Sequence, residues 1–407
     1  MRTGAPEVPA TGVWAEVVGQ PDAVGTLHAA ADAARRQVRG ESVPPGAMTH
    51  AWLFTGPPGS GRSIAARAFA AALECEDSST PGCGRCTACR TVLQGTHADV
   101  KLVVPEGLSI SVAEMRALVQ AAARRPSTGQ WRVVLIEDSD RLTEGAANAL
   151  LKAVEEPPPR TVFLLCAPSD HPEDVSVTIR SRCRVLQLRT PLAHSIAEVL
   201  RERDDIDPQL AEWAAEVCGG HIGRARRLAT DEQARDRRES VLRIPLGLQR
   251  FSDVFTAASG LVKLAETEAV TANEDRNESE REELKTAMGA GGTGKGTASA
   301  TRGANAALKE LEKRQKSRAT RSQRDALDLA LVDLAGFYRD VLVTRTGSGA
   351  VLNHPDFARA SAKAAAEWTS ESTLRRLEAV LECRTALTQN VKPLIAVEAM
   401  LATLFTG

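Results

Sequence analysis

The 407-residue sequence predicts an α/β domain with a parallel sheet, followed by a region built only of helices. Two observations support this prediction. Short apolar runs alternate with amphipathic stretches from His50 to Thr190, which is typical of parallel strands joined by crossover helices. Beyond Thr190, apolar residues recur only at three- and four-residue spacing, which is typical of helices. Because aromatic residues make up only 3% of the chain, aliphatic side chains must fill the cores.

Each expected strand is a short run rich in Val and Leu. The runs are AWLF at 51–54, VKLVV at 100–104, RVVLI at 132–136, TVFLL at 161–165 and RVLQL at 184–188. Helical patterns separate them at 62–75, 111–125 and 146–156. We therefore expect the α/β domain to occupy residues 1–190.

The helical region is expected to contain two parts. A small lid over residues 191–240 includes Gly219-Gly220, which ends a helix, and a C-terminal bundle covers residues 241–407. Within the bundle, a charge-rich stretch contains GAGGTGKGTASATRGA, which holds too little apolar surface to fold. The sequence therefore predicts a disordered insertion at about 271–322.

The overall charge restricts the class of protein. A formal net charge of −1 disfavours a strongly basic protein that wraps DNA, so any contact with nucleic acid must come from a local patch or from partners. The N-terminal residues lack an apolar signal segment, and no run of about 18 apolar residues would span a membrane. We expect a cytoplasmic protein with no membrane partner.

A phosphate-binding loop is indicated between the strand at 51–54 and the next helix. Its residues are Gly56, Pro57, Pro58, Gly59, Ser60, Gly61, Arg62 and Ser63. The motif expects Lys where this chain has Arg62, whose guanidinium is bulkier and more rigid, whereas Ser63 keeps a hydroxyl for Mg²⁺. Two interpretations stay open with even weight: binding of ATP with Mg²⁺, and a glycine-rich turn that no longer holds nucleotide tightly.

A second nucleotide motif is indicated where the strand at 132–136 ends in Glu137 and Asp138. In phosphoryl-transfer sites, the first acid of such a pair holds magnesium and the second orients the attacking water. The usual order is Asp then Glu, and it is reversed here. Misplacement of catalytic groups on the scale of about 1 Å costs about 10²-fold in rate, so we expect weak hydrolysis or none.

Four of the eight cysteines form a compact group, Cys75, Cys83, Cys86 and Cys89. Their C-x7-C-x2-C-x2-C spacing lets four thiolates converge tetrahedrally at about 2.3 Å from Zn²⁺, which leaves no open position for catalysis. The alternative of four unrelated buried thiols is disfavoured because the segment between them is polar. The sequence therefore predicts a structural zinc site at 75–89.

Basic residues form two further groups, before the last strand and in the lid. They are Arg180, Arg182 and Arg184, and Arg224, Arg226 and Arg227. Such groups are usually solvated faces, and only a position beside a subunit interface would make them functional.

Taken together, these features resemble the clamp-loader branch of the AAA+ family, the gamma/tau/delta-prime group of bacterial DNA polymerase III. The resemblance rests on VVGQ at 17–20, the loop at 56–63, the cysteine group, NALLKAVEEPP at 148–158 and Ser181-Arg182-Cys183. It covers about the first 230 residues. The segment at 148–158 and the Ser-Arg-Cys tripeptide are highly specific, whereas the phosphate-binding loop alone fits many unrelated ATPases.

The resemblance implies a partner set and a role for one arginine. Clamp loaders of this family are hetero-pentamers with gamma/tau and delta subunits that open a sliding clamp and place it on primed DNA as part of the DNA-directed DNA polymerase holoenzyme, a nucleotidyltransferase. Arg182 would then serve as an arginine finger, acting in trans on a neighbour's ATP. Residues 241–407 would form the collar that holds the subunits together.

Departures from the family pattern favour its non-motor member. They are Arg62, the reversed acids Glu137 and Asp138, Cys166-Ala167-Pro168 in place of a threonine-bearing sensor, and Gly223 at the sensor-arginine position. For the last of these, Arg224 could substitute after a one-residue slip. A gamma/tau-type motor would also be expected to carry a longer extension after Phe405. The alternatives are that ATPase motor and a stand-alone AAA+ ATPase of DNA repair.

Overall fold

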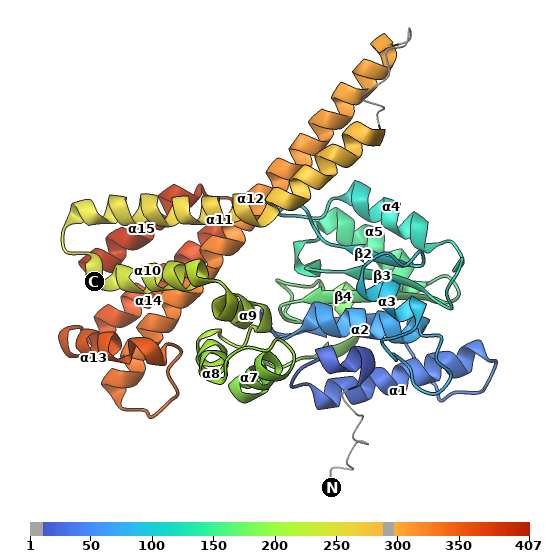
Figure 1. Ribbon diagram of the computed structural model, residues 1–407, viewed down its shortest axis with the longest axis horizontal. Coiled ribbons are helices and arrows are strands. Elements are labelled where there is room, and N and C mark those ends of the chain that lie inside the picture. The colour runs from blue at the N-terminus through green and yellow to red at the C-terminus, as the bar shows by residue number, and fades with distance from the viewer. Residues whose placement is uncertain (1–10, 288–296) are drawn as a thin grey trace. The chain divides into compact units, whose positions relative to one another are not determined.

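The computed structural model describes residues 11–287 and 297–407, which form two compact units, Met1–Ala229 and Thr230–Gly407. The first unit contains a five-stranded parallel sheet in the order β2-β3-β4-β1-β5 (Figure 1). Its strands are β1 Ala51–Thr55, β2 Val100–Val103, β3 Arg132–Ile136, β4 Thr161–Ala167 and β5 Arg184–Gln187. The predicted α/β fold with a parallel sheet is confirmed, and strand β1, which precedes the phosphate-binding loop, lies inside the sheet.

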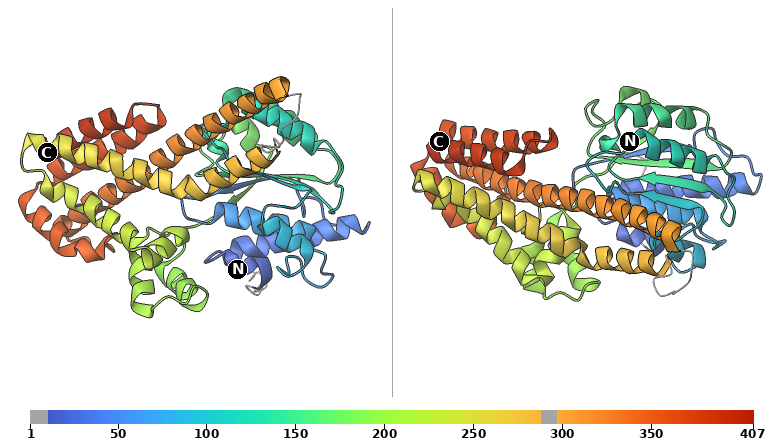
Figure 2. Two further views of the ribbon diagram at one scale, coloured as in Figure 1. Left: turned by 45° about the horizontal axis from the view of Figure 1, so that its top comes forward. Right: turned by 90° about the horizontal axis from the view of Figure 1, so that it is seen from above.

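Helices cover both faces of this sheet (Figures 1 and 2). The first-face helices are α1 Pro21–Val38, α2 Arg62–Glu74 and α3 Thr87–Leu93, and the second-face helices are α4 Val112–Ala122 and α5 Glu144–Glu155. The side chains of β1 point alternately to the two faces of the sheet. Trp52 and Phe54 belong to the core with α1 and α2, whereas Ala51 and Leu53 belong to the core with α4 and α5.

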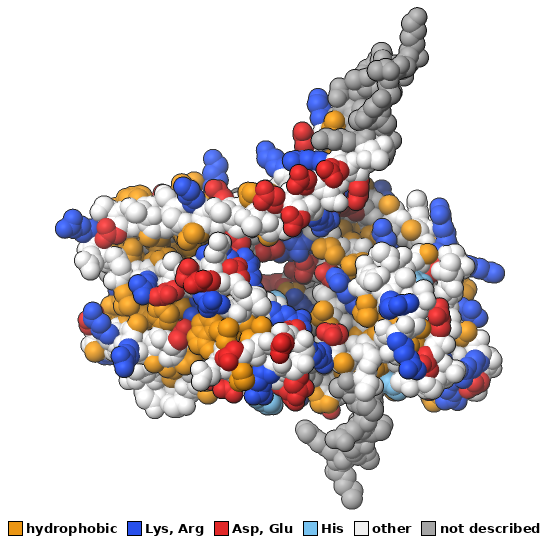
Figure 3. Space-filling view, viewed as in Figure 1, with side chains coloured by type: hydrophobic (Ala, Val, Ile, Leu, Met, Phe, Trp, Pro, Cys, Tyr) orange, Lys and Arg blue, Asp and Glu red, His pale blue; other side chains and the backbone are white. Residues whose placement is uncertain are grey.

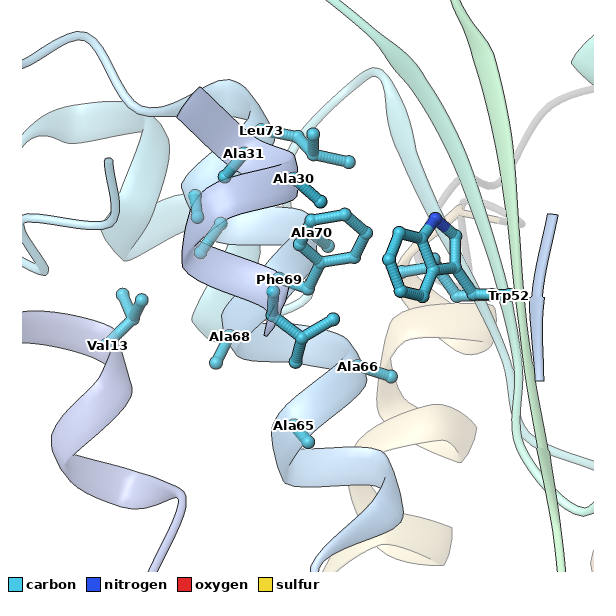
Figure 4. Close-up of a cluster of buried hydrophobic side chains, with 14 of the residues drawn as sticks. Val13, Ala30, Ala31, Trp52, Ala65, Ala66, Ala68, Phe69, Ala70 and Leu73 are labelled. Carbon is cyan, nitrogen blue, oxygen red and sulfur yellow. The ribbon is translucent and has the colours of Figure 1, made fainter. Parts of the chain in front are cut away.

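The first core is rich in alanine, as the aliphatic composition predicts. Ala65, Ala66, Ala68 and Ala70 of α2 are buried, and these small side chains allow α1 to pack closely (Figure 4). The larger groups meet at the sheet, where the rings of Trp52 and Phe69 pack edge to face with centroids 5.1 Å apart.

A small helical region completes the first unit. It holds α7 Ala193–Glu202, α8 Pro208–Val217 and α9 Ile222–Thr230, whereas the short helix α6 Val177–Arg180 precedes β5 and packs on α5. An ion pair joins Arg203 to Glu16 at 3.3 Å, and thus ties the lid to the short helix η1 Gly12–Glu16. The division between units falls before Thr230 rather than at residue 240, because α10 Glu232–Gly247 packs with the helices that follow it.

The second unit is entirely helical in its described residues. After α10 come α11 Phe251–Ala287, α12 Thr297–Thr346, α13 Ala358–Glu367, α14 Ser370–Thr388 and α15 Pro393–Thr406. A short 3-10 helix, η3 Pro355–Phe357, precedes α13, and a similar one in the first unit, η2 Ser139–Arg141, follows β3. Leu331, Leu334 and Phe337 of α12 are fully buried among α11, α14 and α15. None of the described helices is both long and apolar enough to cross a membrane.

The prediction of a disordered insertion at about 271–322 is wrong for its described parts. Residues up to Ala287 continue α11, residues from Thr297 belong to α12, and the two helices pair (Figure 2). The pairing uses polar contacts, in which Asn273 Nδ2 donates to Ser322 Oγ at 2.9 Å. Low apolar content therefore misled the prediction, because hydrogen bonds between the helices stand in for apolar packing here. The centre of the Gly-rich tract, residues 288–296, lies outside the described residues.

A buried polar network stabilises the loop before α13. Arg238 Nη2 contacts His354 Nδ1 at 2.9 Å, and His354 Nε2 contacts the carbonyl of Asp333 at 3.0 Å. Because arginine only donates, Nδ1 must accept, and the proton of neutral His354 must lie on Nε2. Burial lowers the pKa of His354; Asp333 and Asp340 oppose this shift and Arg238 adds to it. The fold therefore favours the neutral imidazole.

This network makes the second unit sensitive to acid. The folded-state pKa of His354 lies below its ordinary value of 6.5, so the unfolded chain takes up a proton first as the pH falls. We therefore expect this group to lower the stability of the second unit as the pH falls from about 7.5 to about 5.5, across the ordinary value. Calorimetric unfolding at both pH values should show a smaller pH effect for His354→Asn than for the wild type. The exposed His194→Asn serves as the control, and equal pH effects in all three proteins would contradict the assignment.

Candidate functional site

The phosphate-binding loop lies between β1 and α2 and borders a cavity of about 350 Å³. The loop supplies Pro58 to Ser63, and the other walls come from Glu16, Val17, Val18, Val199, His221, Gly223 and Arg226. Gly59 and Gly61 both have a φ of 87°, which favours glycine and turns the chain into the N-terminus of α2. Free amides at a helix N-terminus favour anions, so the cavity has the local geometry of a phosphate site.

Gln20 stabilises the phosphate-binding loop through hydrogen bonds of its side chain. Its side-chain amide accepts from the backbone N–H of Arg189 at 3.1 Å and donates to the carbonyls of Ser60 and Arg189. The VVGQ segment at 17–20 thus joins the loop to the end of β5, while Val17 and Val18 line the cavity. A role of this kind for Gln20 follows from the structure and was not evident from the sequence.

Arg62 lies where the motif expects lysine, and its side chain turns inward. Among the described residues, neither Arg62 Nη1 nor Ser60 Oγ has a hydrogen-bond partner, although both atoms are buried. Burial raises the pKa of Asp140, the neighbouring Asp138 raises it further, and Arg62 partly opposes the shift. The positive charge of Arg62 therefore acts on the acidic segment that follows β3.

The acids after β3 differ in what they contact. Glu137 Oε1 accepts a hydrogen bond from Arg67 Nη2 of α2 at 2.8 Å, and this carboxylate is largely shielded from solvent. Asp138 has a φ of 51°, a left-handed conformation that is uncommon for a residue with a side chain. This pair leaves the second oxygen of Glu137 for a magnesium ion, and the positive charge of Arg67 opposes a cation beside it. The nucleotide motif could not have predicted that Arg67 pairs with Glu137, because the two residues are 70 positions apart in the sequence.

The lid residue His221 packs directly on the loop. A Cβ atom placed on Gly59 would lie 2.6 Å from the Cα atom of His221. His221 Nδ1 accepts a hydrogen bond from the amide of Arg224 at 3.3 Å, and burial, followed by the charge of Arg224, lowers the pKa of His221. A neutral imidazole therefore closes one wall of the cavity, and sequence reasoning did not identify it.

This close approach gives a testable difference between two glycines that share a φ of 87°. Gly59→Ala should destabilise the first unit by about 3 kcal/mol, because the methyl group meets His221 in addition to the left-handed backbone cost. Gly61→Ala, with the same φ of 87° and no atom within 4 Å of its Cβ position, should cost only about 1 kcal/mol. Urea unfolding measures both, and equal losses would show that the lid does not pack on the loop.

The four predicted zinc ligands converge at the end of α2. Their sulfur atoms all lie within 4.8 Å of one another, with Cys75 and Cys89 buried and Cys83 and Cys86 half-buried. The amides of Cys83, Cys86 and Cys89 each donate to the sulfur of the preceding cysteine in the group at 3.4 Å. The hydrogen bond from the Cys89 thiol lowers the pKa of Cys75. Four sulfurs with amide donors fit a tetrahedral metal site.

The N-terminal turn η1 packs against this cysteine module. Trp14 Nε1 donates to the carbonyl of Pro81 at 2.8 Å, and the amide of Val13 donates to Gly82 at 3.0 Å. A Cβ atom on Gly12 would lie 2.2 Å from the Gly82 carbonyl oxygen, so only glycine fits there. The module is thus part of the first core rather than a separate appendage.

Arg182 follows α6 and is accessible at the surface. Its Nη2 atom pairs with Glu155 Oε1 of α5 at 2.6 Å, and its Nη1 atom donates to the carbonyl of Thr178 at 2.9 Å. The two side chains remain 35% and 43% exposed. The Ser-Arg-Cys tripeptide and the segment at 148–158 therefore meet in space. Neither Arg182 nor the cysteine group lines the cavity beside the phosphate-binding loop.

The other basic groups predicted from the sequence are partly used within the fold. Arg180 pairs with Asp170 at 2.7 Å, Arg184 lies over the ring of Trp52 at 4.8 Å, and Arg226 pairs with Asp204 at 2.6 Å. These contacts support the interpretation of structural and solvated faces for those three residues.

Part of this chain is similar in sequence to known proteins. The family model described as "DNA polymerase III, delta subunit" matches residues 36–191. The subunit delta′ of Bacillus subtilis is 30% identical over 197 residues, 48% of this chain and 59% of that protein. The subunit delta′ of Pseudomonas aeruginosa is 37% identical over 185 residues, 44% of this chain and 55% of that protein.

A third relative belongs to the other subunit type. The subunit tau of Bacillus subtilis is 32% identical over 172 residues, 42% of this chain and 30% of that protein. The chain thus spans little more than half the length of the delta′ relatives and less of the tau relative. Each of these matches covers less than half of this chain.

Proposed function

We propose that this chain, whose residues 36–191 match the DNA polymerase III delta-subunit family model, is a member of the clamp-loader family and acts as the delta-prime subunit of that machine. In this role it is a cytoplasmic stator that assembles with gamma/tau and delta subunits as a hetero-pentamer. The assembly loads the sliding clamp on primed DNA. Arg182 supplies an arginine finger to the ATP site of a neighbour.

The ion pair between Glu137 and Arg67 carries the distinction from a motor subunit. A motor needs a carboxylate at the end of β3 to hold magnesium, and here the Oε1 atom of Glu137 already pairs at 2.8 Å with Arg67 of α2, whose positive charge disfavours a second cation nearby. Arg62 adds a second positive charge at the loop in place of the compact lysine ammonium. Hydrolysis by this pocket is therefore weak or absent, even where ATP enters the cavity.

The exposed position of Arg182 supports a role toward another chain. Its guanidinium is held by Glu155 and Thr178 and remains partly open to solvent, outside the cavity of its own chain. An exposed ion pair contributes about 0–1 kcal/mol, so exchanging Glu155 for a phosphate group is energetically accessible. A fixed arginine beside a neighbour's triphosphate stabilises the charge of the transition state without a nucleotide on its own chain.

The cysteine group is assigned to a structural Zn²⁺. Cys75, Cys83, Cys86 and Cys89 would hold the ion, and four thiolate ligands leave no position for a substrate or water. The ion would fix the connection between α2 and α3 and the surface on which η1 packs.

Reconstitution tests the proposed function. The chain is mixed with the gamma/tau and delta subunits of its own organism, and the products are separated by size-exclusion chromatography. We expect one complex that contains all three subunit types and whose DNA-stimulated ATPase exceeds that of the mixture without this chain. Failure to join the other subunits would contradict the assignment and would favour a stand-alone ATPase.

A gamma/tau-type motor is the second candidate, because the cavity of about 350 Å³ and the hydroxyl of Ser63 remain compatible with a bound nucleotide. That candidate predicts turnover by the isolated chain. The stator predicts turnover only in the complex.

A further inference from the structure

The paired ends of α11 and α12 form a distinct segment of the second unit, which we call the arm and define as residues 271–284 and 306–325. The apolar core of this unit includes Ala265 of α11 and Leu327 of α12 but no residue of the arm. Figure 1 shows the two helices running on side by side beyond the bundle. The arm is therefore a two-helix element without a large apolar core of its own.

Polar side chains fill the seam between its helices. Arg318 is 5% exposed, and it donates to Asn277 Oδ1 at 2.9 Å and to Glu280 Oε1 at 2.8 Å. Gln315 Nε2 donates to the carbonyl of Asn277 at 3.0 Å. These contacts fix the register of the two helices and use the charge of Arg318 internally.

The two helices of the arm carry opposite charge. Residues 306–325 of α12 contain seven Lys and Arg against three Asp and Glu, whereas residues 271–284 of α11 contain six Asp and Glu against two Arg. Figure 3 shows both basic and acidic side chains on the visible face of the arm, with several basic ones along its edge. Because the chain as a whole has a net charge of −1, this basic edge is a local feature and not part of a general positive surface.

Three lysines form the exposed face of this edge. Lys309, Lys313 and Lys316 recur at i, i+4 and i+7, so they lie on one side of α12. All three are exposed, and within the described part of the chain no carboxylate pairs with any of them. Glu310 and Glu312 lie nearby and reduce the positive potential without reversing the excess of Lys and Arg.

The spacing of these lysines matches a phosphate backbone. Seven residues of helix rise about 10.5 Å, and one strand of B-DNA carries about three phosphates over that axial length. A membrane surface is a poorer fit, because peripheral helices add large apolar side chains beside their lysines, and the neighbouring exposed residues here are Ala306, Ser317 and Thr320. We propose that the face of Lys309, Lys313 and Lys316 binds the phosphate backbone of DNA. The proposal does not depend on the delta-prime assignment.

Fluorescence anisotropy of a labelled DNA duplex with the full chain tests this proposal, between about 50 mM and 200 mM salt. The test variant is Lys309→Gln/Lys313→Gln/Lys316→Gln, since glutamine keeps the helix propensity of lysine. The control is Lys101→Gln/Lys263→Gln/Lys363→Gln, which removes the same charge from exposed positions outside the arm. Circular dichroism checks that all proteins keep their helix content.

We expect the arm variant to bind at least about tenfold more weakly at about 50 mM salt, with a log–log salt slope lower by about 2–3 because three phosphate contacts are lost. The control variant should bind within about twofold of the wild type. Glu274→Gln/Glu278→Gln, on the acidic helix of the arm, should tighten binding. Three results would each overturn the proposal: no DNA binding by the wild type at about 50 mM salt, equal weakening in the arm and control variants, or binding to anionic lipid vesicles in place of DNA.

Discussion

Replacing Cys83 and Cys86 with serine is expected to abolish metal binding and to unfold the segment between α2 and α3. Both sulfurs belong to the group in which all four sulfurs lie within 4.8 Å of one another. Structural zinc contributes on the order of 10 kcal/mol to the folding of the segment that binds it. The effect should extend to η1, because Trp14 and Val13 bond to the loop between the cysteines. Metal analysis and limited proteolysis measure the two losses.

The control for this change is Cys183→Ser. Cys183 is half-buried like Cys83 and Cys86, and it lies outside the metal-binding group. The Cys183→Ser protein should keep a full equivalent of zinc and resist protease as the wild type does. Native protein with less than about half an equivalent of zinc, or a double serine variant that retains the metal, would contradict a four-cysteine site.

Replacing Arg182 with alanine is expected to lower ATP hydrolysis at the neighbouring site of the reconstituted complex by about 10³-fold. The loss arises because the finger stabilises charge that develops only in the transition state, so nucleotide affinity and assembly should change little. Single-turnover hydrolysis by the purified complex, with size-exclusion chromatography of the same samples, measures both properties.

Glu155→Gln separates the finger from the ion pair that holds it. If the effect of Arg182→Ala came from the broken pair with Glu155, the glutamine variant would reproduce it. Since an exposed pair is worth about 0–1 kcal/mol, we expect less than about a fivefold change from Glu155→Gln. Unchanged turnover in the Arg182→Ala complex would refute the proposed role.

The sheet and its helices follow from local sequence signals. The strand at 51–54 was predicted because its four apolar residues precede a glycine-rich turn, and β1 is buried on both faces as that pattern implies. The cysteine group was predicted because its spacing is itself the geometric requirement of the site. In both cases the signal lies within a short stretch of chain.

The features that were not predicted depend on residues far apart in sequence. The pair of Arg67 with Glu137 and the contact of His221 with Gly59 require the packing of α2 and the lid to be known. The arm was expected to be disordered because its apolar content is low, yet the bond of Asn273 to Ser322 joins positions separated by 49 residues. Polar pairing between helices leaves no periodic apolar signal to detect.

Equilibrium titration of the isolated chain with a fluorescent ATP analogue, followed by a turnover assay with primed DNA, tests the central claim most directly. A stator whose Glu137 is engaged by Arg67 and whose loop carries Arg62 should bind the analogue weakly and show no DNA-stimulated hydrolysis. Tight binding together with DNA-stimulated hydrolysis by the isolated chain would contradict the stator and identify a motor subunit.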